Sequence, residues 1–600
     1  MAVTVHSTPP KDQFGMVDRC FRFAFWAAVI WACYGVLHSF STEWVWRLDF
    51  ITASGVPLAF LAYATLGSRS NPIPRVWAAG FLILAVLTMV LSMRFDPSPT
   101  LQHAHALMHC VLVIAGLLWL LPDRFAGDTD AFLLVLVLLS CVHLAILFFL
   151  PPIFNTLQHW FWIHPPKPIA HIGLPFAMAG VSLLVAFLVL QQRIPVVVSL
   201  LLLVGLGTGL QYGFALLEGR GLTALEDRIT LSGHAEFATI AVQQGDIPRV
   251  LVHYEELLES GELGQFAKSK PPGVLLFYML TDRVAGWLSP EVGLDDPEEA
   301  RLQALRRIAT YTWPLFSLLV LIPLFLLARL LLGENAARVT CLLYTVVPSA
   351  NLITLHTDQV LFPLFFVGSL YLSSVAFSRN RWIPGLLAGA CSYLAIYLSF
   401  ALILTAPFMI GLGYLICIRD ERPGVLSRFS KSLLAIGLGA LALDVLFRVF
   451  LGYDAPLRNQ NALAHHAQWK QWTSALKPTL YFAALALTEF SVWVGVPVAL
   501  LAGYQVRPLL RPGFWSRVHS SRAVLIGFGP VLFSLITILA LLGKTKGEVA
   551  RLWLFLMPLA CMAASITLTE RYASRRWATW LVFALQWITV LLIKTRQDFW

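Results

Sequence analysis

A short stretch of the chain places two lysines and a proline pair directly before an apolar segment. In GQFAKSKPPGVLLFYML, residues 264–280, the polar part ends at Lys268 and Lys270. Lysine and arginine side chains bind phosphate through charge-assisted hydrogen bonds. The prolines fix φ and lack an N–H, so they end the preceding structure and hold Lys270 at a defined depth. The stretch predicts a phosphate-binding cation where lipid meets water; snorkelling of a lysine at a helix end is the alternative.

A carboxylate lies upstream of this step, in a segment with helical spacing. Between residues 232 and 242, Phe237, Ile240 and Ala241 fall on one apolar side, and Glu236 falls elsewhere. This pattern predicts an amphipathic helix that lies on the membrane surface. Such a helix would hold Glu236 near a lipid head group, where it could act as a general base; a solvated surface residue is the alternative.

Composition indicates what kind of protein carries these groups. The chain has 600 residues, 58% hydrophobic and 13% charged, whereas soluble domains hold about 25% charged residues. Long apolar runs recur along nearly the whole length, so we expect an all-α polytopic membrane protein. The net charge of +10 lies mostly in loops, where it indicates membrane topology, so we expect no nucleic-acid partner.

The distribution of arginines orients the predicted spans. We expect seven spans between residues 20 and 216, a long polar stretch at 217–307, and ten spans between residues 308 and 595. With the N-terminus inside, the arginine-rich loops all fall on the cytoplasmic side; they are near residues 69–75, 379–381, 419–431, 507–522 and 571–576. The number of spans is consistent with this orientation only if the segment 273–289 does not cross the membrane. This segment is short and carries Asp282 and Arg283. The stretch 217–307 is then extracytoplasmic.

The chemistry is concentrated in the C-terminal two thirds. We therefore divide the chain into an accessory N-terminal transmembrane module of about six helices, 1–193, and a transmembrane core, 194–600. The core carries the large extracytoplasmic loop 217–307. The eight cysteines lie in or beside apolar runs, and none forms a metal-type CxxC, so we expect neither a disulfide framework nor a cysteine zinc site.

Four motifs, in order, resemble those of the GT-C superfamily of polytopic membrane glycosyltransferases. The stretch SGHAEFATIAVQQGD followed by SKPPGVLLFYML is similar to the first outer loop of protein O-mannosyltransferases and the lipid A aminoarabinose transferase. Phe237-Ala238 matches the Tyr-Ala of their Asp-Glu-x-x-Tyr-Ala pattern, and Lys270 matches the lysine of their Lys-Pro-Pro. At the two positions where that pattern begins with Asp-Glu, this sequence has Gly233 and His234 instead. A related pattern, Asp-Ser-Gly-Glu-Phe, would place its glutamate on Glu236.

Two further motifs lie downstream. SANLITLHTDQVLFPLFF resembles the family's outer turn that ends in Pro-Asp, with Asp358 in the aspartate position. GEVARLWLFLMPLA resembles the late Arg-Tyr-x-x-Pro-x-x-Pro turn: Arg551 and Pro558 keep the spacing, and Leu552 replaces the tyrosine.

The resemblance implies a GT-C fold and transfer of a sugar from a polyprenyl-phosphate donor to a hydroxyl of a glycan, lipid or protein. It implies an inverting reaction on the outer face of a bacterial-type inner membrane. Catalytic candidates are Glu236, then Asp227, then Asp358. Donor-phosphate candidates are Lys270, Arg551 and Lys544, with Lys546 as a helper. Substrate-binding candidates are His356, His465, His466 and Trp469. A transporter or flippase of lipid-linked glycans and a non-catalytic scaffold are the alternatives.

Other polar residues have competing interpretations. Asp444 and Arg448, four residues apart, are expected to pair. Glu489 lies in the middle of a predicted span. An acid there is a candidate functional residue, and a role in fixing a contact between helices is the alternative. His103, His105 and His109 form HxHxxxH, but neither a carboxylate nor a cysteine completes a metal set. No cofactor is assigned, and a divalent metal is left open.

Overall fold

The computed structural model describes residues 129–149, 169–231, 235–288, 296–352, 360–420, 424–472, 475–510 and 513–596, with Leu157, His159, Trp160 and Trp162. The three histidines of HxHxxxH, together with His356 and Asp358, lie outside these residues. The chain divides into one unit of residues 1–134 with 156–158 and a second of 135–155 with 159–600. Helix α6 (Thr129–Phe149) contributes its C-terminal part to the second unit.

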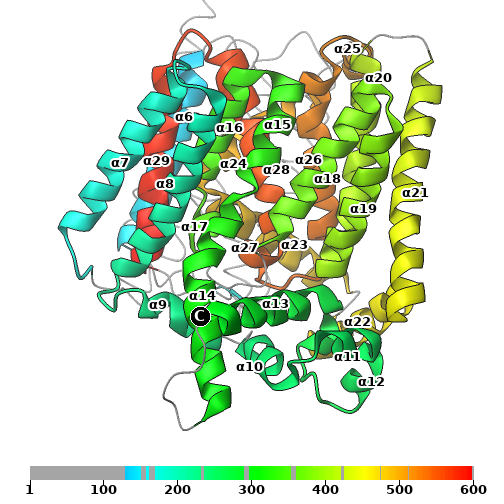
Figure 1. The fold of residues 1–600 in the computed structure, drawn as a ribbon. Helices are drawn as coiled ribbons and strands as arrows, with labels where there is room; N and C mark the ends of the chain where they lie inside the picture. Colours follow the sequence, from blue (N-terminus) through cyan, green and yellow to red (C-terminus); the bar gives the residue numbers. More distant parts are fainter. Residues whose placement is uncertain are drawn as a thin grey trace, which may run out of the picture. The chain divides into compact units, whose positions relative to one another are not determined.

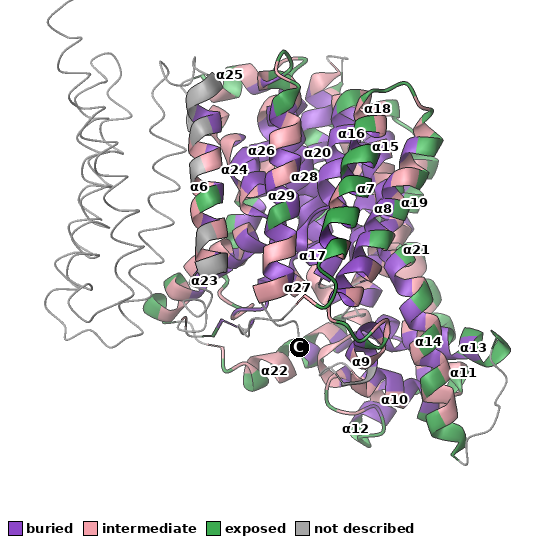
Figure 2. Cartoon of the chain, turned by 90° about the vertical axis from the view of Figure 1, so that its left-hand side faces the viewer, coloured by how far each residue is buried: buried purple, intermediate pink, exposed green. Residues whose placement is uncertain are grey.

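The second unit is a bundle of long apolar helices, and no strand occurs in the part that the structure describes. Nine helical stretches there are long and apolar enough to cross a membrane. They are α7 (Gly173–Leu190), α8 (Val196–Leu216), α14 (Pro297–Leu318) with α15 (Leu321–Leu332), α18 (Phe362–Arg379), η4 (Phe400–Leu404) with α20 (Thr405–Arg419), α21 (Val425–Leu451), α26 (Ala523–Leu541), η6 (Leu554–Leu556) with α28 (Met557–Ile566) and η7 (Thr567–Arg571), and α29 (Trp577–Arg596). Figure 2 shows buried residues concentrated inside this bundle. The all-α polytopic class is therefore confirmed.

Several short helices gather at one end of the bundle. They are α9 (Thr223–Leu231), α10 (Ala235–Gln244), α11 (Ile247–Val252), α12 (Tyr254–Glu259), η2 (Ala267–Ser269), α13 (Pro272–Leu288) and α22 (Ala455–Trp469). In Figure 1, α9 to α13 and α22 lie together at the bottom, and α25 (Phe514–Val518), from the arginine-rich stretch 507–522, lies at the top. The long polar loop and these arginines are thus at opposite ends, as the positive-inside rule predicts.

Helix α13 lies across the end of the bundle (Figure 1) and is not among the candidate spans. This agrees with the expectation that 273–289 does not cross. A Cβ on Gly273 would lie 2.3 Å from the carbonyl oxygen of Tyr397, so glycine permits the close contact between α13 and the end of α19 (Trp382–Leu398). Trp287 and Leu288 on α13 are exposed, as in a helix that contacts the membrane surface.

Two predicted spans have a different form in the structure. The single span expected at 478–502 is α23 (Leu476–Val494) followed by α24 (Val496–Tyr504) and η5 (Arg507–Leu510), bent by 112°. Gly495 makes the break with φ +91, a value that favours glycine. The span expected at 338–355 contains α16 (Glu334–Tyr344) and the short α17 (Pro348–Leu352). Because α16 is buried from Ala336 to Tyr344, its apolar run reflects protein packing rather than lipid contact.

Candidate functional site

Glu236, near the start of α10, holds the loop that leads to Lys270. Its Oε1 accepts a hydrogen bond from the Gln265 backbone N–H and its Oε2 from that of Phe266, both at 2.8 Å. Gly264 makes the turn with φ +70, and a Cβ there would lie 2.0 Å from Glu236 Oε1. The carboxylate therefore acts as a clamp on this turn.

Helix α10 has the amphipathic form predicted for it. Phe237, Ile240 and Ala241 are buried, and the ring of Phe237 lies 5.8 Å from that of Tyr278 on α13. Because α10 packs on α13 through this face, Glu236 is positioned from both sides: by the helix that carries it and by the loop that it binds.

The turn held by Glu236 rests on α22. Phe266 meets Trp469 edge to face at 5.6 Å. Arg458 donates to the carbonyl oxygen of Lys268 at 2.7 Å and pairs with Glu255 at 3.0 Å. The backbone before Lys270 is thus fixed against α22, so the depth of the lysine is set by tertiary contacts as well as by the prolines.

The two neighbouring histidines on α22 face positive charges. Burial, with Lys470 and Lys270 nearby, lowers the pKa of His466 to about 4. Burial, with Lys268 and Arg458, also lowers the pKa of His465. His466 is therefore neutral at neutral pH and can donate or accept a hydrogen bond. Its ring lies 5.3 Å from that of Trp472.

Glu548 joins the end of α22 to the turn that carries Arg551. Its carboxylate pairs with Lys470 and, at 2.7 Å, with Arg551. Burial would raise the pKa of this carboxyl, but Arg551 and Lys470 outweigh burial and lower it to about 2. Glu548 is therefore ionised at neutral pH and holds the two cations in place.

Two more lysines come from the loop before α27 (Val549–Leu552). Lys546 Nζ donates to the carbonyl oxygens of Lys470 and, at 2.9 Å, Gln471. Lys544 Nζ lies 4.5 Å from the centre of the Trp472 ring. We call Lys270, Lys470, Lys544, Lys546 and Arg551 the cationic site. It draws on three segments of the chain that are distant in sequence.

Two members of this arrangement are not among the site residues predicted from the sequence. Lys470 directly follows Trp469 in NALAHHAQWKQW, and Glu548 lies three residues before Arg551 in GEVARLW. The Glu-x-x-Arg spacing of the second is a recognisable pairing signal. Nothing local in the sequence relates Lys470 to Glu548, because the two residues are 78 positions apart, with helices α23 to α26 between them.

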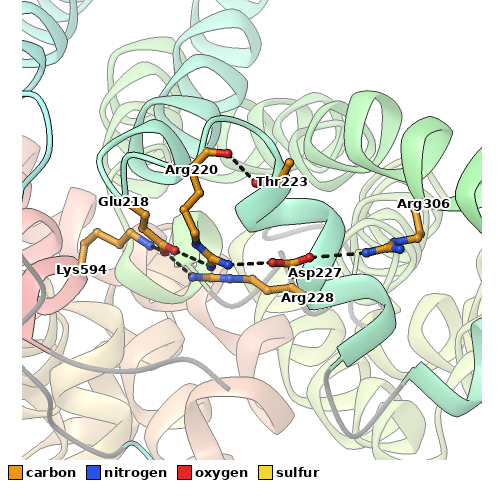
Figure 3. A network of polar contacts seen from close by, with 7 residues as sticks. All are labelled: Glu218, Arg220, Thr223, Asp227, Arg228, Arg306 and Lys594. Atoms are coloured by element: carbon orange, nitrogen blue, oxygen red, sulfur yellow. Dashed lines mark hydrogen bonds and ion pairs between the residues drawn. The ribbon is translucent and has the colours of Figure 1, made fainter.

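Asp227, the second catalytic candidate, belongs to a salt-bridge network. Its Oδ2 pairs with Arg220 at 2.7 Å and its Oδ1 with Arg306 at 3.4 Å. Figure 3 shows that Glu218 extends the network through Arg220, Arg228 and Lys594. These charges join the turn after α8 to α9, α14 and α29. Both oxygens of Asp227 therefore have cationic partners.

The remaining polar predictions have clear outcomes in the described residues. Asp444 and Arg448 pair at 3.8 Å, as expected, and Arg448 also lies 3.3 Å from Asp454. Glu489 is fully buried and accepts a hydrogen bond from the backbone N–H of Ala550 at 2.8 Å, so it fixes a contact inside the bundle. Among the residues that the structure describes, no group of three or more His, Cys, Asp or Glu side chains could hold a metal ion.

Comparisons with known proteins bear on residues inside the predicted core. Residues 310–447 match the family described as dolichyl-phosphate-mannose-protein mannosyltransferase. The match confirms the resemblance that the motifs predicted, and it includes His356 and Asp358 but lies between the segments of the cationic site. A comparison with curated proteins gave no match.

Among solved structures, the chain is similar to a crystal structure of the Archaeoglobus fulgidus oligosaccharyltransferase in complex with Zn and sulfate. The sequences are 14% identical, and the TM-score is 0.32. The similarity covers 54% of this chain and 44% of that one, so the chain spans less than half of the length of this relative.

Proposed function

We propose that the chain is a membrane glycosyltransferase of the GT-C type and that it uses a polyprenyl-phosphate-linked sugar as its donor. The family match at residues 310–447 supports this proposal. The acceptor is a hydroxyl group on a glycan, a lipid or a protein. The reaction takes place at the end of the bundle that carries α10, α13 and α22, on the extracytoplasmic face of a bacterial-type inner membrane. Membrane lipids surround the bundle and contact α13.

The cationic site is the observation that carries this proposal. Lys470 and Arg551 come from separate segments and pair with one ionised acid, Glu548. Lys270, from a third segment, and Lys470 both act on the neighbouring His466. A departing polyprenyl phosphate carries negative charge, and cations that are already in place stabilise that charge in the transition state. Lys544 and Lys546 add positive charge to the same site. The position of this site next to the surface helices α13 and α22 suits a phosphate on a membrane-embedded chain.

The transfer is a single displacement with one carboxylate base. The base takes the proton of the acceptor hydroxyl, and the acceptor oxygen bonds to the anomeric carbon as the bond from that carbon to the phosphate oxygen breaks. The phosphate keeps the electron pair, so it needs no proton. Attack opposite the leaving group inverts the configuration. Glu236 is the proposed base, with Asp227 and then Asp358 next in order.

Aromatic and imidazole groups beside the cations suit the sugar and the acceptor. Trp469 is 52% exposed, so part of its ring is accessible to a sugar, while Lys470 Nζ lies over the ring at 4.9 Å from its centre. The ring of His466 lies 5.9 Å from that of Trp469. We propose that Trp469, His465 and His466 bind substrate, together with His356.

A transporter or flippase of lipid-linked glycans is the second candidate, and the broken helix pair α23 and α24 favours it, because discontinuous helices are common in transporters. Transfer of labelled sugar to an acceptor in detergent distinguishes the two functions. An enzyme forms product without a membrane, whereas a flippase needs two compartments.

Donor affinity tests the proposed cationic site. Lys270→Ala and Arg551→Ala each remove one cation, and loss of a charge-assisted contact costs about 1.5–3 kcal/mol, or about 10- to 150-fold in donor affinity. Arg249→Ala is the matched control, because Arg249 is an exposed cation of the same loop that pairs with Glu262 at 2.9 Å. Unchanged donor affinity in both site variants would rule the assignment out.

A further inference from the structure

Trp162 reaches the neighbourhood of the cationic site from the predicted N-terminal module. It precedes α7, and its side chain is 1% exposed. Its Nε1–H donates to Glu489 Oε1 at 2.7 Å, and its ring lies 4.9 Å from that of Trp493. Its own carbonyl oxygen accepts from Trp160 Nε1 at 2.8 Å. The indole is therefore fixed on several sides.

Glu489 also binds the turn that carries Arg551. The same Oε1 accepts from the backbone N–H of Ala550 at 2.8 Å. Ala550 lies between Glu548 and Arg551, which pair with each other at 2.7 Å. Two hydrogen bonds and one peptide bond thus lead from Trp162 through Glu489 and Ala550 to Arg551. Because buried polar groups lose free energy when a partner is removed, each contact constrains the next.

The two oxygens of Glu489 are used differently. Oε1 accepts both hydrogen bonds, whereas Oε2 has no hydrogen-bond partner among the described residues. A glutamine at this position keeps an oxygen for both donors, but a leucine keeps none. Substitutions at this residue can therefore separate the effect of the two hydrogen bonds from the effect of the negative charge.

We infer that Trp162 and Glu489 are positioning residues for the cationic site. Glu489 fixes the turn of residues 548–551, and Trp162 fixes Glu489. The segment before α7 is consequently part of the scaffold of the donor site, which gives the N-terminal module a role in donor binding. The inference rests on the proposed function, since it concerns the affinity of the site for a phosphate-bearing donor.

The test measures binding of a polyprenyl phosphate to the full chain in detergent, with the corresponding polyprenol as the uncharged reference. Trp162→Phe keeps an aromatic ring but removes the N–H, and we expect affinity for the phosphate to fall about 3- to 10-fold. Glu489→Leu should reduce affinity at least as much, and Glu489→Gln should stay within about 2-fold of wild type. Trp587→Phe is the matched control, because the Nε1 of this buried tryptophan has no hydrogen-bond partner among the described residues.

The outcomes separate the inference from the proposed function. If wild type does not prefer the phosphate over the polyprenol, the proposed donor site is wrong, and this inference falls with it. If wild type prefers the phosphate and Trp162→Phe binds as wild type does, the inference is overturned and the donor site stands. Equal losses in Glu489→Gln and Glu489→Leu, with thermal unfolding as in wild type, would show that charge matters and would overturn the positioning role.

Discussion

Glu236 and Phe266 lie 30 residues apart in the sequence and are joined by a hydrogen bond of 2.8 Å from the backbone N–H to the carboxylate. The neighbouring N–H of Gln265 binds the other oxygen of the same carboxylate at 2.8 Å. A carboxylate has room for further hydrogen bonds at each oxygen, so this clamp leaves Glu236 able to accept a proton. Its two roles, holding the turn before Lys270 and acting as a base, can be tested separately.

The first prediction concerns the base. Glu236→Gln keeps the size of the side chain but cannot take up a proton at neutral pH, and loss of a general base costs about 10²- to 10⁴-fold in rate. We expect the turnover number for sugar transfer to fall in this range. Donor affinity should change much less, because the glutamine oxygen still accepts one of the two backbone hydrogen bonds.

Asp227→Asn is the paired variant for this prediction. Both oxygens of Asp227 are engaged by Arg220 and Arg306, so we expect a lower melting temperature with little loss of turnover. If Asp227→Asn abolishes turnover and Glu236→Gln does not, the two roles are exchanged. Normal turnover in both variants would move the base elsewhere, with Asp358→Asn the next variant.

The second prediction concerns the clamp itself. In Gly264→Ala, the new Cβ would lie 2.0 Å from Glu236 Oε1, so the carboxylate must leave the two backbone amides. We expect a lower melting temperature and weaker donor binding, because the loop before Lys270 loses its fixed position. Gly261→Ala is the control: its φ is +84, but no atom lies within 4 Å of its Cβ, so it carries only backbone strain. Equal effects of the two substitutions would contradict the clamp.

The sequence predicts the bundle well and the site only in part. Hydropathy locates the long helices because each apolar run must satisfy its own backbone in lipid. It cannot distinguish a lipid-facing run from a buried one, which is why α16 resembles a span. The break at Gly495 is equally hidden, since a Cβ there would meet Gln586 at 2.0 Å and that neighbour comes from a distant helix.

Local pattern also identifies candidates without identifying their partners. The Lys-Pro-Pro step and the amphipathic spacing around Glu236 are visible in the sequence, because each motif lies within one short segment. The contacts of Lys470 with Glu548 and of Trp162 with Glu489 join residues 78 and 327 positions apart. Such pairs depend on tertiary packing, and a single sequence carries no signal for them.

The third prediction follows from the lowered pKa of Glu548. Its ordinary value of 4.5 falls to about 2 in the folded chain, so the unfolded chain binds the proton first as pH falls. The stabilisation is therefore complete above pH 4.5 and is lost as pH falls toward 2. We expect wild type to melt at a higher temperature than Glu548→Gln by a constant margin above about pH 5. The margin should shrink steadily between pH 4.5 and 3. A margin independent of pH over that interval would contradict the ion pairs with Lys470 and Arg551.

The fourth prediction places the site outside the cytoplasm. Glu259 and Glu299 are exposed residues on either side of α13 in sequence, and because α13 lies across the bundle end without crossing, both must face the same compartment. Glu259→Cys and Glu299→Cys should react with a membrane-impermeant thiol reagent applied to intact cells. Ser574→Cys is the matched variant, since Ser574 is exposed and lies in the arginine-rich stretch 571–576, where the positive-inside rule predicts the cytoplasm. It should react only after the membrane is opened, with labelling of wild type subtracted as the background.

Reaction of only one of the two glutamate positions from outside would mean that α13 crosses. Protection of both, with reaction at Ser574→Cys, would place the cationic site in the cytoplasm and exclude the proposed outer face.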